Sequence, residues 1–176
     1  MMKRITCGIL ALLTLLGCGG EGVGGARPPG AGAEERCANF VTRSLTVEAR
    51  TRTALREALG APESVDVTTE PNRHIPDGTD SLVTVSYPGV AFSLRKPPEA
   101  DDLMERIVVR DNRWLRWSEP GIGATSEDVT LILGEPAERD ATLLRYSCST
   151  GIVEEPVSFV LENGRVREIV FEFYVD

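Results

Sequence analysis

The chain has 176 residues, a formal net charge of −8 and 41% hydrophobic residues. Such an acidic chain lacks the basic surface that nucleic acid requires, so we expect no nucleic-acid partner. Its single histidine, His74, has no second histidine or nearby cysteine at metal-ligand spacing, so we expect no metal site and no cofactor.

The N-terminus has the layout of an export signal, with Lys3 and Arg4 followed by the apolar run 5–16. The run is too short for a membrane span, which needs about 20 apolar residues. It ends in Leu-Leu-Gly-Cys, which resembles the lipobox of bacterial lipoproteins. This resemblance implies cleavage between Gly17 and Cys18 and a lipid anchor on Cys18. The alternatives are an ordinary signal peptide with a chance cysteine, or an uncleaved anchor.

Residues 18–35 are expected to form a flexible tether, because Gly, Ala and Pro dominate them and they show no apolar periodicity. Loss of Lys3 and Arg4 with the signal peptide (1–17) would change the net charge from −8 to −10. In a bacterium with two membranes, Gly19 lacks the aspartate of the inner-membrane retention signal. By analogy with that family, we expect an outer-membrane protein that faces the periplasm.

Two cysteines remain beyond the signal peptide and the lipid site, namely Cys37 and Cys148. In an oxidising compartment an even pair favours a disulfide between the start of the folded region and its second half. The alternative is two separate buried thiols.

Two short helices of similar pattern are predicted, one after Thr51 and one after Thr125. In each, the threonine can cap the first turn, and apolar residues recur at helical spacing. Each pattern ends at a glycine, Gly60 or Gly134, with a proline two residues later. Segments 37–45 and 112–117 are either further helices or edge strands.

Period-two patterns separated by turn residues predict antiparallel strands after each helix. Pro88-Gly89 and Asn163-Gly164 mark the tightest turns, whereas 70–80 reads as a loop. We therefore expect an α+β fold of two tandem units, 36–111 and 112–176, each a short helical segment packed on a small antiparallel sheet. The alternating apolar residues are Val83, Val85, Tyr87, Val90, Phe92, Leu94, Ile107, Val109, Leu144, Tyr146, Val157, Phe159, Leu161, Ile169, Phe171, Phe173 and Val175.

The stretch 122–136, with Gly123, the capping Thr125 and Gly134-Glu135-Pro136, resembles a fold shared by two exported families. One is the small outer-membrane lipoprotein of the β-barrel assembly machine, and the other is the β-lactamase inhibitor protein. Strand segments 157–161 and 163–169 extend the resemblance. Two tandem copies resemble the inhibitor, whereas lipid attachment resembles the assembly subunit. These are capping and turn residues, so the resemblance concerns fold more than function.

No catalytic residues are assigned, and we expect no enzyme. His74 lies in a polar loop, and the chain has no Gly-x-Ser-x-Gly nucleophile elbow. The acidic clusters at 99–102 and 154–155 are interpreted as solvated turns, because neither has the order of a calcium loop. Gly121 and Gly123 lack the lysine of a phosphate loop and are assigned to a turn.

The sequence Arg113-Trp114-Leu115-Arg116-Trp117 combines two large aromatic residues with two guanidinium groups. Such residues are enriched at binding hot spots, so Arg113, Trp114, Arg116 and Trp117 are candidate partner contacts. Core packing, or cover for the seam between the two units, is the interpretation that we favour over a partner contact.

From these features we expect a lipid-anchored cell-envelope protein that acts as a non-catalytic protein-binding or assembly module. One alternative is an inhibitor of an envelope or secreted enzyme. Another is a small-ligand-binding lipoprotein, with the ligand held between the two units.

Overall fold

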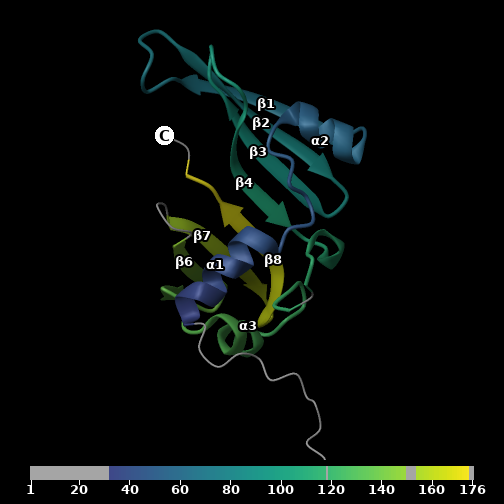
Figure 1. Cartoon of the computed structure of the whole chain (residues 1–176), viewed down its shortest axis with the longest axis vertical. Helices are drawn as coiled ribbons and strands as arrows, with labels where there is room; N and C mark the ends of the chain where they lie inside the picture. Colours follow the sequence, from purple (N-terminus) through teal and green to yellow (C-terminus); the bar gives the residue numbers. More distant parts are fainter. Residues whose placement is uncertain (1–31, 118, 150–153, 175–176) are drawn as a thin grey trace, which may run out of the picture. The chain divides into compact units, whose positions relative to one another are not determined.

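The computed structural model describes residues 32–117, 119–149 and 154–174 (Figure 1). The signal peptide, Cys18 and most of the expected tether lie outside the described residues, and so does Val175. Three α-helices are present there, α1 (Ala33–Arg43), α2 (Arg52–Leu59) and α3 (Ser126–Leu133), with a 3₁₀ turn, η1, at Asn112–Trp114. The strands are β1 (Ser64–Pro71), β2 (Thr79–Tyr87), β3 (Val90–Lys96), β4 (Leu103–Val109), β5 (Glu138–Arg139), β6 (Leu143–Ser149), β7 (Glu154–Glu162) and β8 (Arg165–Glu172).

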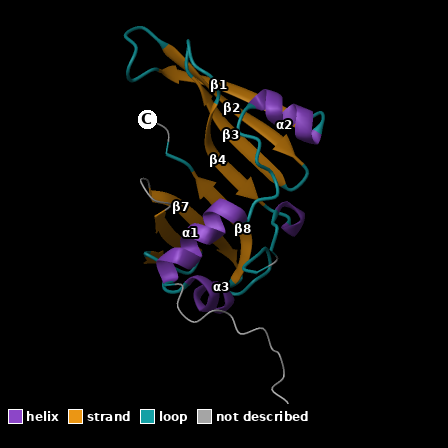
Figure 2. Ribbon diagram, in the orientation of Figure 1, coloured by secondary structure: helices purple, strands orange, loops and turns teal. Residues whose placement is uncertain are grey.

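All eight strands belong to one antiparallel sheet of order β1-β2-β3-β4-β8-β7-β6-β5 (Figure 2). The expected fold of two tandem units, each with its own small sheet, is therefore wrong. The two sets of strands meet where β4 pairs with β8, with Ile107 opposite Phe171 and Val109 opposite Ile169. Two separate sheets would leave these apolar strands with exposed edges, and joining them pairs both edges.

One face of this sheet, the covered face, carries the hydrophobic core. Phe92, Phe159 and Phe171 are 1% exposed or less, as are their neighbours Leu94 and Ile169. These are alternate residues of their strands, as the period-two patterns predicted.

The helices lie against the covered face. Phe40 of α1 places its ring centroid 5.5 Å from that of Phe159 and 5.7 Å from that of Phe171. Leu55 of α2 and Val129 of α3 are fully buried. No described helix has the length and apolar character needed to cross a membrane.

Both predicted helix caps are present. The Thr51 side chain accepts a hydrogen bond from the Ala54 N–H, and Thr125 forms a capping box with Asp128. The terminal glycines Gly60 and Gly134 have φ of 82° and 90°, but ψ near ±160° places them in an extended region restricted to glycine rather than in the left-handed helical region.

The glycines at the ends of α2 and α3 each accept a hydrogen bond from a tyrosine. The Tyr87 hydroxyl donates to the Gly60 carbonyl at 3.2 Å, and the Tyr146 hydroxyl donates to the Gly134 carbonyl at 3.0 Å. In each case a strand residue fixes the end of a helix. A side chain at position 134 would also meet Ala33 of α1, 2.7 Å from its Cβ.

Segment 37–45, which the sequence left open, is helical as far as Arg43, where α1 ends. Cys37 joins this helix to β6 through a disulfide with Cys148. Their Cα atoms lie 5.2 Å apart and 111 residues separate them in the chain. The bond joins the first helix to the second half of the sheet, which is the connection expected from the two exported cysteines.

Candidate functional site

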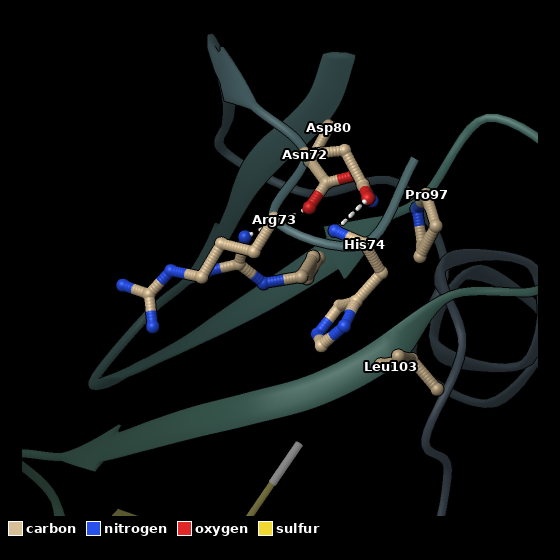
Figure 3. Close-up of a pocket in the computed structure, with 7 residues that line it drawn as sticks. Asn72, Arg73, His74, Asp80, Pro97 and Leu103 are labelled. Atoms are coloured by element: carbon tan, nitrogen blue, oxygen red, sulfur yellow. Dashed lines mark hydrogen bonds and ion pairs between the residues drawn. The ribbon is translucent and has the colours of Figure 1, made fainter. Parts of the chain in front are cut away.

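A cluster of charged side chains surrounds Arg95 of β3 and connects it to the hairpin of β1 and β2. Figure 3 shows Asn72, His74 and Asp80 from this hairpin. The Arg95 guanidinium contacts Asp80 at 2.9 Å and Glu105 at 2.5 Å, and it also pairs with Glu70. Three carboxylates from three strands thus share one cation. This cluster joins β1, β2, β3 and β4 on one side of the sheet.

Asn72 connects this cluster to the hairpin loop. Its side-chain nitrogen donates to Asp80 at 2.6 Å, while its oxygen accepts from the backbone N–H of His74 at 2.8 Å and of Ile75 at 2.6 Å. The Asp80 residue is 3% exposed. The hydrogen bond from Asn72, followed by that from Arg95, lowers the pKa of Asp80 below its usual value.

A hollow of about 250 Å³ lies beside the cluster, and Figure 3 shows His74, Pro97 and Leu103 around it. The one carboxylate that lines it, Asp80, already binds Arg95. Within the described residues, no group of three or more His, Cys, Asp or Glu side chains is placed to hold a metal ion. The contacts of this cluster fix the hairpin, and we assign no reaction to it.

The candidate partner contacts 113–117 are placed differently from one another. Trp114 is half-buried against the core, and its ring nitrogen donates to the Pro88 carbonyl at 2.9 Å. Arg113 stacks on this ring, with its guanidinium carbon 5.5 Å from the centroid, and also donates to Pro88. These two residues hold the β2–β3 turn.

Arg116 donates to the Leu45 carbonyl at 2.9 Å and pairs with Glu48, so it holds the segment after α1. Trp117 is 45% exposed, whereas Leu115 is buried. In a strand these two side chains would lie on the same face. They differ here because the segment is not a strand, and residues 112–114 form a 3₁₀ turn. Of the four candidates, Trp117 presents the most open aromatic surface.

The acidic residues 99–102 were expected to be solvated, and one of them, Asp102, is not. Glu99 is exposed, but the Asp102 carboxylate is 9% exposed and pairs with Arg52 at 2.8 Å. It also accepts from the Arg52 backbone N–H at 2.9 Å, next to the Thr51 cap. Asp102 therefore fastens the start of α2 to the β3–β4 connection.

The second face of the sheet, called the open face here, is the one on which the three helices do not lie. Its middle is nevertheless buried, at Val108, Ser158 and Val170. One row across the open face runs Thr84, Ser93, Arg106 and Glu172 through four paired strands. These side chains are half-buried or exposed. A hollow of about 540 Å³ lies over this row and extends to Tyr174, which is 65% exposed.

The comparisons with known proteins identify no relative: no family model, curated protein or solved structure matches the chain. No residue of the open face or of β1 was among the site residues predicted from the sequence. The alternation of Val65 and Val67 with polar residues is a strand signal that could have identified β1.

Proposed function

We propose that this protein is a lipid-anchored cell-envelope protein that binds another protein through its sheet and performs no catalysis. The observation that carries the proposal is the contrast between the two faces of the sheet. The covered face is buried by the three helices, whereas the row at Thr84, Ser93 and Arg106 is left accessible.

The chemistry of the open face supports protein binding. Hydroxyl groups, one cation and one carboxylate lie in the row, and the exposed ring of Tyr174 borders it. Tyrosine and arginine are, with tryptophan, enriched at interface hot spots, and serine supplies adaptable hydrogen bonds in antibody paratopes. An extended surface of this kind suits a protein better than a small ligand.

The alternative of a small ligand beside Trp114 has less support. The space bounded by Trp114, Phe92 and Ile107 has no volume left for a ligand. In the hollow near His74, the one lining carboxylate, Asp80, is already paired with Arg95.

The proposed anchor at Cys18 fits this function. The chain between Cys18 and α1, which begins at Ala33, is rich in glycine, and a flexible segment of about 14 residues reaches roughly 20 Å on average. A tether of that reach would keep the open face near the membrane at a high local concentration for a neighbouring protein.

The test is chemical crosslinking in intact cells with the native chain and a Cys18→Ser variant. We expect the native chain to fractionate with membranes, to incorporate labelled lipid and to capture one dominant envelope protein. The variant should lose the lipid label and capture less of this protein. An unchanged distribution in the variant would refute the anchor, and a native chain that captures no protein would refute the binding function.

A further inference from the structure

The sheet has two very different edges. At one edge, β5 is only two residues long, and the turn that follows is closed by hydrogen bonds from Thr142 to Asp140. At the other edge, β1 is eight residues long and pairs only with β2. Every residue of β1 except Glu70 is exposed. Long exposed edges are sites where a further strand can add.

Successive residues of β1 point their backbone N–H and C=O groups alternately toward β2 and toward the outer edge of the sheet. Asn72 donates from its N–H to Gly78 at 2.8 Å, directly after the register pair Pro71–Thr79. Since bonded pairs alternate along an antiparallel ladder, Glu70 and Thr68 also turn their backbone groups toward β2. Val65, Val67 and Thr69 therefore direct their N–H and C=O groups outward.

Pro71 agrees with this assignment. It occupies an outward position, where a proline removes no bond to β2. An incoming strand would thus find three consecutive outward residues with both donor and acceptor, and a carbonyl acceptor at Pro71.

The side chains of β1 define which strand would fit. On the covered side, Val65 and Val67 are 51% and 57% exposed, although they pair with the buried Val85 and Val83. These two valines extend the core beyond the part that the helices cover. A strand added here would bury them if it placed apolar residues on the same side.

The other side of β1 is acidic. Asp66 and Glu70 share it with Ser64 and Thr68, and the chain has no Lys or Arg between Arg56 and Arg73. Glu70 already pairs with Arg95, which leaves Asp66, the third residue of the strand, to meet an incoming cation. Opposite charges placed across neighbouring strands are favourable, and like charges are unfavourable.

We propose that β1 binds an extended segment of a partner protein as a ninth strand, and that this segment alternates apolar residues with Lys or Arg. The apolar residues pack beside Val65 and Val67, and the cations face Asp66. This inference rests on the proposed protein-binding function and names the chemistry of the partner. A second copy of this chain fits less well, since it would bring another acidic strand to the edge.

The test uses the full chain in detergent micelles and a synthetic peptide of alternating Lys and Val, with a matched peptide in which Glu replaces each Lys. Hydrogen–deuterium exchange should slow at the amides of Val65, Val67 and Thr69 with the Lys peptide and not with the Glu peptide. Equal effects of both peptides, or protection elsewhere alone, would overturn the proposal.

Variants at one exposed position supply the control. Thr69→Pro removes an outward N–H, and Thr69→Ala keeps it. The dissociation constant for the Lys peptide should rise about fivefold or more in Thr69→Pro and stay unchanged in Thr69→Ala, as expected for the loss of one interstrand hydrogen bond. Equal affinities would contradict strand addition. If Thr69→Pro fails to fold, Asp66→Lys serves instead, and it should reverse the preference between the two peptides.

Two outcomes separate this inference from the proposed function. If crosslinking in cells captures the same protein with Thr69→Pro as with the native chain, the binding function stands and the β1 site is refuted. If the native chain sediments as a dimer that Thr69→Pro dissociates, the occupant of β1 is a second copy, and the basic segment is refuted.

Discussion

Asn72 organises the β1–β2 hairpin through one side chain. Its oxygen accepts from two loop N–H groups, and its nitrogen orients Asp80 toward Arg95. The sequence indicated only a polar loop around His74, because an asparagine in a turn does not show which distant carboxylate it will meet. By contrast, Thr51 and Thr125 were predictable as caps, since a capping bond is made within three residues of chain.

The lowered pKa of Asp80 predicts how stability depends on pH. A carboxylate whose pKa is lower in the folded state stabilises the fold above its unfolded pKa, near 4, and loses this contribution as pH falls through the folded value. We expect Asp80→Asn to be less stable than the native chain at pH 7, with the difference shrinking from about pH 4 downward.

Urea unfolding at a series of pH values measures this dependence. Glu99→Gln, which removes one carboxylate from an exposed turn, controls for the change in net charge. A difference between Asp80→Asn and the native chain that stays constant from pH 7 to about pH 2 would refute the electrostatic role of the Asn72–Asp80–Arg95 contacts.

At the scale of elements, most strands were predicted from the sequence, whereas β1 was missed. The strands β2, β3 and β6 bury alternate apolar residues, so their period is visible in the sequence. The same alternation marks β4, β7 and β8, although each of these strands also buries three consecutive residues. β1 is exposed on both faces, and its apolar signal is limited to Val65 and Val67. Helix α1 was ambiguous because the core it contacts comes from strands more than 100 residues away.

The link between α1 and β6 predicts a large effect of the cysteines on stability. Cys37→Ala or Cys148→Ala should lower the free energy of unfolding by roughly 2 to 5 kcal/mol, because the bond closes a long loop in the unfolded chain.

Thermal melts of the two variants, beside the native chain with and without a reducing agent, test this prediction. The single variants and the reduced native chain should melt at similar temperatures, below that of the oxidised protein. A reducing agent that leaves the melting temperature of the native chain unchanged would show that the bond does not stabilise the fold.

At the scale of the whole molecule, the sequence indicated the strands but not which edges would pair. Residues 103–109 and 165–172 each show a buried apolar face, and nothing local in either segment specifies the other as its neighbour. The register Arg106–Glu172 to Val109–Ile169 makes one sheet of what the pattern suggested were two.

One continuous sheet should unfold as one cooperative unit. We expect a single urea transition, with coincident curves from tryptophan fluorescence, which reports on Trp114 and Trp117, and from far-ultraviolet circular dichroism. Phe171→Ala, placed at the β4–β8 junction, should lower the free energy of unfolding by about 3 to 5 kcal/mol. Both curves should then move together to lower urea concentration. Two separated transitions in the native chain would mean that the halves of the sheet fold independently.

The bond between Cys37 and Cys148 also determines how the molecule would respond to mechanical load. Tension applied between its two ends would enter α1 at Ala33, cross to β6 through the sulfur atoms, and leave through β7 and β8. The 110 residues enclosed between the two cysteines, which include β1 to β4, would carry none of this tension along their backbone. A pull on the two ends of the chain would therefore leave the backbone of β1 unloaded.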